Sequence, residues 1–240
     1  MMVKFRAEGR VLEGTLEGET VEGQGRSYRL EEVELLAPCS PSKVVCVGLN
    51  YREHARELKM EIPGEPIIFL KPPSSVVGPG ADIVMPGSSS QVDYEGELGM
   101  VIGRRCKDVP ADEAGAYILG FTCFNDVTAR DLQRKDGQWT RAKSFDTFAP
   151  LGPGIVPLSL KEAGSARIQT RVDGQVRQDS STSDLIFSLP RLLEFISGIM
   201  TLERGDVIAT GTPPGVGPLK RGETVEVEIQ GIGILCNRTV

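Results

Sequence analysis

The chain has 240 residues, 40% of them hydrophobic, and its 27 basic and 33 acidic side chains give a formal net charge of −6. This length supports one or two domains with a sizeable core, and the acidic balance excludes the basic patch that nucleic acids or anionic membranes need. No apolar run approaches the ~20 residues of a membrane-spanning helix, and the N-terminus lacks a signal-peptide apolar region, so we expect a soluble cytoplasmic protein.

Residues 1–40 are expected to form a small N-terminal unit of antiparallel strands. Short apolar and polar runs alternate there between glycines, a pattern typical of strands joined by tight turns. Pro38 and Pro41 interrupt regular structure and mark the boundary. We therefore divide the chain into an N-terminal β unit over 1–40 and a catalytic domain over 41–240.

The larger domain begins with a buried strand over 43–49, followed by a helix over 50–59 that has strong helix formers but few apolar residues. Because this helix has little to bury, we expect it to lie on the surface and to order weakly. The other predicted strands lie at 67–70, 83–85, 92–102, 121–125, 207–209, 225–229 and 234–236, and the other helices at 111–119, 129–134 and 190–199.

Strands dominate this pattern, and they do not alternate with helices as βαβ units. The pattern predicts an α+β fold with a mostly antiparallel sheet, not a doubly wound parallel sheet. The pair Asp173-Gly174, between two short apolar runs, predicts a hairpin with a type I′ turn.

Acidic residues gather at one end of the strand predicted over 92–102. Asp93, Glu95 and Glu97 alternate along the chain, so a strand places them on one face. Like charges on one face repel one another unless a cation lies among them, and oxygen ligands suit Mg²⁺, Mn²⁺ or Ca²⁺ better than zinc. The alternative is an acidic solvent-facing strand, and this segment alone does not decide between the two.

Asp126 adds a further carboxylate at the end of a second buried strand. Two glutamates from one strand and an aspartate from another would leave about three positions of an octahedral ion open for water or substrate. Asp126 could instead cap the helix that follows it. Capping explains this one residue but not the acids on the other strand.

Histidine and cysteine content limits the remaining chemistry. Five scattered cysteines without a Cys-x-x-Cys pair argue against a disulfide framework and a structural zinc site. The only histidine, His54, has Glu57 three residues later, so a helix places both on one face, where the carboxylate can orient the imidazole as a general base. A surface histidine is the alternative, but a weakly apolar segment after a buried strand suits a closing lid.

Lys143 and the loop around Thr212 are weaker candidates. A lysine opposite an enolate or carboxylate stabilises developing negative charge, although most lysines lie on the surface. The loop over 210–217 follows a strand, and its backbone amides and the Thr212 hydroxyl could hold a substrate carboxylate. It is not a phosphate loop, because the Gly-x-x-x-x-Gly-Lys pattern is missing.

Six spaced motifs follow one another along the larger domain. They are His54-x-x-Glu57, Phe69-Leu70-Lys71-Pro72, Asp93-Tyr94-Glu95-x-Glu97-Leu98, Asn125-Asp126-Val127-Thr128-Ala129-Arg130-Asp131-x-Gln133, Ala142-Lys143-Ser144-Phe145 and Gly205-Asp206-Val207-Ile208-Ala209-Thr210-Gly211-Thr212-Pro213. This series resembles the fumarylacetoacetate hydrolase superfamily from about residue 43 to the C-terminus. The resemblance implies a mixed β-sheet rolled into an irregular barrel, a homodimer, and a divalent metal held by carboxylates.

The resemblance also implies a ligand set for that metal, namely Glu95, Glu97 and Asp126, with Mg²⁺ as the expected ion and Mn²⁺ or Ca²⁺ as alternatives. Asp93 falls outside the ligand set of the family, although the strand argument places it on the same face. Fumarylacetoacetate hydrolase itself has a fourth acidic ligand seven residues before the histidine, where this chain has Val47.

For the catalytic groups, the resemblance implies that His54 and Glu57 form a dyad on a lid and that Lys143 acts beside them. The residues that it places around the substrate are Arg130, Gln133 and Thr212. Without the fourth acid and with a short N-terminal unit, the chain is similar to the small bacterial branch, which holds 2-hydroxyhepta-2,4-diene-1,7-dioate isomerases, related decarboxylases and acylpyruvate hydrolases.

These activities share a 2-oxo or 2-hydroxy-enoate substrate whose enolate the metal stabilises. We expect an isomerase or decarboxylase acting on a dicarboxylate of aromatic catabolism, such as 2-hydroxyhepta-2,4-diene-1,7-dioate. The alternatives within the family are hydrolysis of an acylpyruvate and decarboxylation of oxaloacetate. Two alternatives lie outside the family. A serine hydrolase with His54 as base should survive chelation, and a non-catalytic cation-binding protein should bind Mg²⁺ without any turnover that depends on His54.

Overall fold

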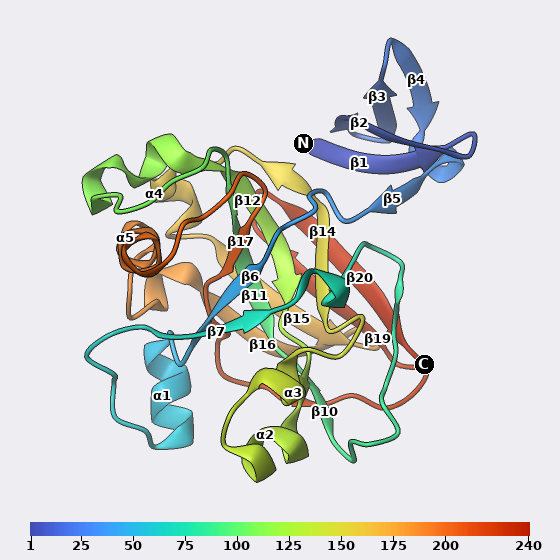
Figure 1. Cartoon of the computed structure of the whole chain (residues 1–240). Coiled ribbons are helices and arrows are strands. Elements are labelled where there is room, and N and C mark those ends of the chain that lie inside the picture. Colours follow the sequence, from blue (N-terminus) through green and yellow to red (C-terminus); the bar gives the residue numbers. More distant parts are fainter.

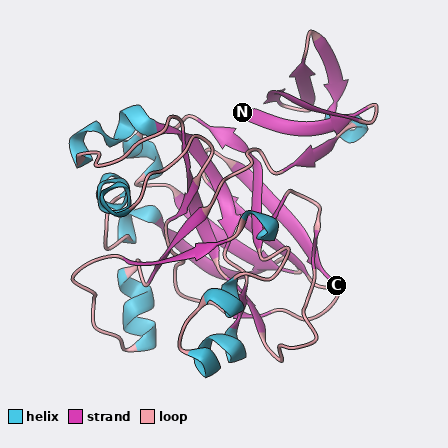
Figure 2. Ribbon diagram, viewed as in Figure 1, coloured by secondary structure: helices cyan, strands magenta, loops and turns pink.

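Three β-sheets and a few short helices make up the computed structural model, which describes residues 1–240 (Figures 1 and 2). The strands are β1 (Met2–Ala7), β2 (Arg10–Glu17), β3 (Thr20–Gly23), β4 (Arg26–Arg29), β5 (Glu34–Leu36), β6 (Val44–Gly48), β7 (Ile67–Lys71), β8 (Val76–Val77), β9 (Asp82–Ile83), β10 (Val92–Tyr94), β11 (Gly96–Ile102), β12 (Ile118–Asn125), β13 (Thr128–Ala129), β14 (Ala149–Val156), β15 (Arg167–Val172), β16 (Gln175–Ser181), β17 (Val207–Ala209), β18 (Gly217–Pro218), β19 (Thr224–Ile229) and β20 (Gly233–Thr239).

The helices are α1 (Arg52–Leu58), α2 (Arg130–Asp136), α3 (Thr140–Lys143), α4 (Leu160–Ala163) and α5 (Leu189–Ile199), with 3₁₀ turns η1 (Leu30–Glu32), η2 (Pro73–Ser75), η3 (Ala111–Tyr117) and η4 (Thr182–Asp184). The helix predicted over 111–119 is therefore a 3₁₀ segment. The surface position expected for α1 is confirmed, because Ala55 is its only buried residue. No helix has both the length and the apolar character that crossing a membrane would require.

The first 36 residues form strands β1–β5, which stand to one side of the molecule in Figure 1. Alternate residues of these strands, including Phe5 and Val21, bury an apolar cluster of their own. One backbone pairing, Met2 with Ile155, joins β1 to β14 of the larger part of the chain.

The largest core lies between two sheets that pack face to face. In the first sheet the strands run β14-β12-β11-β17-β6-β7, and in the second they run β16-β15-β19-β20-β9. Strand β11 is buried on both faces, so it is almost continuously apolar, with Leu98 and Met100 in the largest core and Val101 in a separate cluster. Ile168 of β15 and Val227 of β19 complete that largest core from the second sheet.

The predicted α+β class is confirmed, and most strand pairings are antiparallel. The parallel exceptions are β6 with β17, β8 with β14, and β9 with β20. The long sheet begins at β4 and ends at β7, and these two end strands do not pair. No closed barrel is found, so the rolled barrel that the resemblance implied has no support in the strand pairing.

The hairpin predicted at Asp173-Gly174 joins β15 and β16. Both turn residues have positive φ, 48° at Asp173 and 74° at Gly174, as a type I′ turn requires. The prediction is confirmed.

Asp206 links the start of β6 to the start of β17. Its buried carboxylate accepts hydrogen bonds from the Ser42 backbone N–H at 2.8 Å, the Ser42 hydroxyl at 2.7 Å and the Glu203 backbone N–H at 2.8 Å. Burial raises the pKa of Asp206, but hydrogen bonds from Lys43, Glu203 and Ser42 outweigh it and lower the pKa overall. The carboxylate is therefore charged at neutral pH and fixes the two parallel strands that end at the site described below.

We predict that Asp206→Ala lowers the free energy of unfolding by about 3 kcal/mol in urea denaturation, because several buried donors lose a charged acceptor. A folded-state pKa below the unfolded value stabilises the fold above about pH 4 and stops doing so as the pH falls through it, so the deficit should shrink in acid. Asp179→Ala, which removes an exposed pair with Arg167, is the control and should cost less than about 1 kcal/mol. Equal effects of the two substitutions would contradict the assignment.

Candidate active site

Two neighbouring strands bring the predicted acidic residues together. Glu95 lies in the one-residue break between β10 and β11, Glu97 lies on β11, and Asp126 directly follows β12. The antiparallel pairing of β11 and β12 sets Gly96 opposite Asn125. Two hydrogen bonds then hold the strand ends in register: the Asp126 N–H donates to the Glu95 carbonyl at 2.8 Å, and the Glu95 N–H donates to the Asn125 side-chain oxygen at 2.9 Å.

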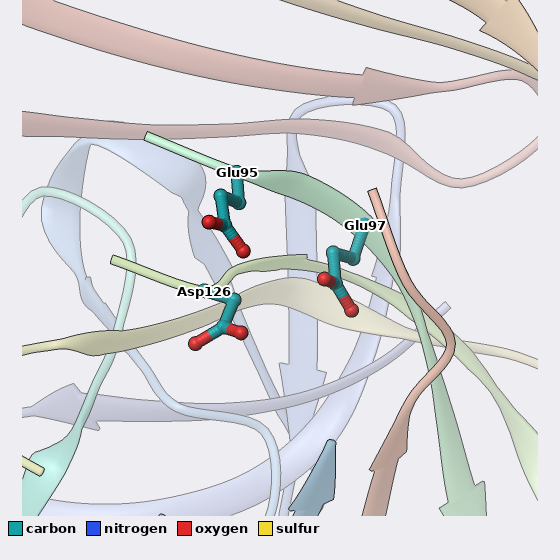
Figure 3. A group of neighbouring side chains, drawn as sticks. All are labelled: Glu95, Glu97 and Asp126. Atoms are coloured by element: carbon teal, nitrogen blue, oxygen red, sulfur yellow. The ribbon is translucent and has the colours of Figure 1, made fainter. Parts of the chain in front are cut away.

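Each of these three acids offers a carboxylate oxygen to one small volume (Figure 3). The oxygens of Glu95, Glu97 and Asp126 lie within 4.8 Å of one another, and all three residues are buried. Magnesium ligands lie at about 2.1 Å from the ion, so a small contraction would place all three oxygens around one cation. The structure brings together the whole predicted ligand set.

Asp93 does not join this group, as the ligand set of the family implied, because its carboxylate pairs with an arginine. The chain breaks at Glu95, and β10 pairs with β13 and β18 in a small separate sheet while β11 belongs to the main sheet. The carboxylate of Asp93 accepts a hydrogen bond from the Arg130 Nε at 2.8 Å, and the same guanidinium pairs with Glu95. Asp93 therefore lies next to Glu95 but outside the three converging carboxylates.

Three cations surround the carboxylates of Glu95 and Asp126. The Nζ of Lys143 donates to Glu95 at 2.9 Å and to Asp126 at 2.6 Å. Lys71 pairs with the other oxygen of Asp126, and Arg130 pairs with the other oxygen of Glu95. Charges buried this deeply are stable only when they are paired and hydrogen-bonded, and these two acids are.

The same contacts keep Glu95 and Lys143 ionised. Burial raises the pKa of Glu95, but Lys143 and Arg130 outweigh burial and lower it to about 2. For Lys143, burial lowers the pKa, and the charges of Asp126 and Glu95 raise it above its usual range. At neutral pH Lys143 is therefore a hydrogen-bond donor and a fixed positive charge, not a base.

Glu97 has no such partner. Its carboxylate accepts a hydrogen bond from the Gly211 N–H at 2.8 Å, and no ion pair reaches it. Burial raises the pKa of Glu97 well above its usual value, and the nearby charges of Asp126 and Glu95 raise it further. This point in the site is short of positive charge, and all the ligands around it are oxygens. Both properties fit a hard divalent cation.

The loop after β17 closes this side of the site. Gly211 has φ of +102°, and a Cβ on it would approach the Cβ of Asn50 to 2.7 Å, so glycine is required there. The Thr212 hydroxyl donates to the Gly96 carbonyl at 3.0 Å and accepts from the Gln178 side chain at 2.8 Å. These contacts hold the loop against the strand that carries Glu97.

A pocket of about 310 Å³ opens above the three carboxylates. It is at the small end of the range for ligand pockets, which suits a small acid. Its lining residues are Val47, Gly48, Leu49, His54, Leu58, Met60, Ile67, Phe69, Glu95, Glu97, Asp126, Arg130, Gln133, Arg134, Trp139, Lys143 and Thr212. Every residue predicted to bind metal or substrate or to act in catalysis is among them except Glu57, which lies behind His54.

The predicted dyad has the expected geometry. The His54 Nδ1 lies 2.9 Å from a carboxylate oxygen of Glu57, and the His54 side chain is only 12% exposed. When Nδ1 donates its proton to Glu57, the Nε2 is left as the basic nitrogen. Glu57 also accepts a hydrogen bond from the Gly215 N–H at 3.1 Å, so helix α1 and the loop after β17 meet at this carboxylate.

Residues at the site that were not predicted as functional include Lys71, Phe69, Trp139 and Arg134. The ring of Trp139 packs edge-on against Phe69 with 5.2 Å between centroids, and the Lys143 Nζ lies 4.9 Å from the centroid of Phe69. Phe69 and Lys71 belong to one of the six motifs, but a lysine at a strand end reads as exposed unless its partner is known. The helix-capping alternative for Asp126 is wrong, because α2 begins only at Arg130, after Ala129.

Comparison with known proteins points to one family. The family profile described as "Fumarylacetoacetate (FAA) hydrolase C-terminal" matches residues 43–240. That span contains every acidic, basic and histidine residue described above.

Named relatives include enzymes from bacteria and mitochondria. A solved structure described as 5-carboxymethyl-2-hydroxymuconate delta-isomerase from Mycobacterium smegmatis is 47% identical, covers 100% of this chain and 98% of its own, and superimposes with a TM-score of 0.93. One described as 2-hydroxyhepta-2,4-diene-1,7-dioate isomerase from Mycobacterium marinum is 44% identical, covers 100% and 97%, and has a TM-score of 0.92. A mitochondrial oxaloacetate tautomerase of Bos taurus is 46% identical over 87% of this chain and 70% of its own length.

We predict that Mg²⁺ binding releases a proton from Glu97. Only the ionised carboxylate binds the cation, and the pKa of Glu97 is raised, so affinity should fall by up to about tenfold per pH unit as the pH is lowered through that pKa. Isothermal titration calorimetry in buffers of different ionisation enthalpy measures both the affinity and the proton release. Glu97→Gln should bind Mg²⁺ more weakly and release no proton, whereas pH-independent binding by the unsubstituted protein would contradict the prediction.

Proposed function

Because the chain belongs to the fumarylacetoacetate hydrolase family, we propose that it is a divalent-metal-dependent isomerase or decarboxylase of a 2-oxo dicarboxylate, such as 2-hydroxyhepta-2,4-diene-1,7-dioate. The observation that carries this proposal is a single small pocket that holds three converging carboxylates, a charged lysine and the one histidine of the chain. An acid-binding centre and a proton-transfer group would therefore both contact a substrate bound in this pocket.

Glu95, Glu97 and Asp126 would hold the ion, and an all-oxygen set favours Mg²⁺, with Mn²⁺ or Ca²⁺ as alternatives. When bound, such an ion polarises the carboxylate and 2-oxo oxygens of a substrate and makes the neighbouring C–H bonds more acidic. Val47 lines the pocket where a fourth acid would bring another negative charge. With valine there, the protein would supply one ligand fewer, and more coordination positions of the ion would be open to the substrate.

His54 is the group that moves the proton. Glu57 accepts the Nδ1 hydrogen, which fixes the imidazole and leaves Nε2 able to take a proton from one carbon of the substrate and return it to another atom. Isomerisation needs this transfer, and decarboxylation needs a proton delivered to the carbon that loses CO₂. No other imidazole exists in the chain to perform either step.

Lys143 supplies a fixed positive charge at the carboxylates. It is buried and protonated, and it lies within hydrogen-bond distance of Glu95 and Asp126, so it stabilises negative charge that develops on the substrate oxygens. Arg130 and Gln133, which also line the pocket, hydrogen-bond to each other at 2.6 Å and orient the wall on the α2 side.

Arg134 favours a dicarboxylate. Arg130 is already paired with Asp93 and Glu95, whereas no ion pair engages Arg134, an exposed residue of the pocket wall. Apolar side chains that include Leu58 and Met60 also line the pocket and suit the carbon chain between two acid groups. A distal carboxylate would then meet Arg134 while the 2-oxo acid end lies at the carboxylates.

A second candidate is a smaller substrate handled by the same groups. The relative named oxaloacetate tautomerase suggests proton transfer between carbon and oxygen of oxaloacetate, and the pocket volume of about 310 Å³ suits a short acid. Hydrolysis of an acylpyruvate is the third use of the same site, and the apolar wall at Leu58 and Met60 would accept its acyl group.

We predict that turnover requires both a divalent ion and His54. Activity should be assayed on a panel of 2-oxo acids by diene absorbance, pyruvate release and enol absorbance. Chelation should abolish turnover and Mg²⁺ should restore it, while His54→Gln should lower kcat by about 10²- to 10⁴-fold without preventing Mg²⁺ binding in calorimetry. Full activity of His54→Gln, or full activity after chelation, would reject this function.

Arg134→Gln should raise KM for a dicarboxylate by about five- to tenfold, because an exposed charge pair with the substrate is lost, and leave KM for a monocarboxylate 2-oxo acid unchanged. Lys135→Gln is the matched control, since it removes the adjacent positive charge of α2 from outside the pocket wall. Equal KM changes for both substrates, or for both variants, would argue against a distal carboxylate at Arg134.

A further inference from the structure

Tyr94 belongs to the motif that carries the two glutamates, yet it does not line the pocket. It is the last residue of β10, is 3% exposed, and pairs through its backbone with Gly217 of β18. Its hydroxyl donates to the carbonyl of Gly215 at 2.8 Å. A buried tyrosine thus contacts the same glycine whose N–H binds Glu57.

Gly215 connects Tyr94 to the dyad. Its N–H donates to the two carboxylate oxygens of Glu57 at 3.1 and 3.4 Å, and its carbonyl accepts from Tyr94. The residue has φ of +93°, and a Cβ on it would lie 2.2 Å from the carbonyl oxygen of Arg177, so the chain passes through a narrow gap that only glycine fits. A small displacement of Gly215 would therefore move the N–H group that donates to Glu57.

Helix α1 is held near its C-terminal end by the Gly215 N–H, which donates to Glu57. Its first turn is fixed to η4 and the residue after it, because the Arg52 guanidinium donates to the Leu185 carbonyl at 2.6 Å and the Glu53 N–H donates to Asp184 at 2.9 Å. Its second half has no buried residue after Ala55. From His54 to the end of the helix, the only hydrogen bonds to segments beyond the helix and the turn that closes it are those between Glu57 and Gly215.

We propose that Tyr94 is a positioning residue for proton transfer: its hydroxyl fixes Gly215, Gly215 fixes Glu57, and Glu57 orients His54. The proposal rests on the proposed function of the dyad and deepens it, because it joins the metal-ligand segment to the lid through a contact separate from the metal. Tyr94, which directly precedes Glu95, would then set the position of His54 and keep it fixed relative to the metal site.

The hydroxyl of Tyr94 is suited to this task over a wide pH range. Burial raises the pKa of Tyr94 to about 12, with Arg177 lowering it and Asp93, Glu57 and Glu223 raising it. The hydroxyl therefore stays protonated and remains a donor to Gly215.

Hydrogen exchange of the metal-free protein tests the first half of the proposal without any turnover. In Tyr94→Phe, the amides of Lys59 and Met60, which close the end of α1, should exchange at least about fivefold faster than in the unsubstituted protein. Amides of β11 should not change. Tyr28→Phe, which removes a tyrosine hydroxyl from the N-terminal unit, is the control. Unchanged exchange at the end of α1 in Tyr94→Phe would overturn the proposal.

A double-mutant cycle tests the second half. Tyr94→Phe should lower kcat about five- to tenfold, with KM and the calorimetric Mg²⁺ affinity unchanged, and should cause no further loss in a Glu57→Ala background. An equal loss in both backgrounds, or weakened Mg²⁺ binding, would show that Tyr94 acts by another route and overturn the proposal. If the unsubstituted protein turns over none of the acids in the panel, the proposed function fails, while the exchange measurement still decides whether Tyr94 holds the lid.

Discussion

The central constraint in this protein is the burial of three carboxylates within 4.8 Å of one another. Negative charges at that separation repel strongly away from water, so the fold must supply positive charge or keep a proton. It supplies positive charge to two of them: Lys143, Lys71 and Arg130 pair with Glu95 and Asp126. No ion pair reaches Glu97, whose pKa is raised by burial and by the two neighbouring carboxylates. A divalent ion at this point would offset the remaining negative charge, so the electrostatics of the protein favour binding of such an ion.

The fold makes this arrangement rigid by placing it between its most buried strands. Strand β11 has every residue buried, and its antiparallel partner β12 ends at Asp126. The parallel pair β6 and β17 lies beside them and is fixed at its start by Asp206. Strand β6 leads into helix α1, which carries His54, and β17 leads into the loop that carries Thr212. The three converging carboxylates therefore lie on or next to the most deeply buried strands, and His54, the proposed proton-transfer group, lies on a helix with a single buried residue. This difference matches their tasks, since ligand geometry must be fixed while a lid must admit substrate.

Sequence reasoning found most of this site, for identifiable physical reasons. The spacing of His54 and Glu57 determines that a helix brings them together, and the prediction of a surface helix followed from its lack of apolar residues. Strand alternation placed Asp93 beside the glutamates, and the guanidinium of Arg130 does bind both Asp93 and Glu95. Alternation could not show that this arginine keeps Asp93 outside the three converging carboxylates. Closure of a barrel cannot be read from periodicity, which reports which residues are buried but not which end strands meet.

Lys71 shows most clearly what a sequence conceals. A lysine at the end of a strand is ordinarily exposed, and only the pairing of β6 with β7 and the position of Asp126 show that this one is fully buried on a carboxylate.

The lining of the pocket has a buried half and an outer half. Its buried half contains Lys143, which pairs with Glu95 and Asp126, and Glu97, which has no ion pair. This half suits the acid end common to all the candidate substrates. Its outer half, which includes Met60 and Arg134, consists of exposed side chains with few other binding partners. Substitutions there cost little stability, because they break no buried pair, and they alter what the distal end of a substrate meets. In the proposed function, one buried centre would serve isomerisation, decarboxylation or cleavage, and the few rim residues on and just after α1 and on α2 would determine which.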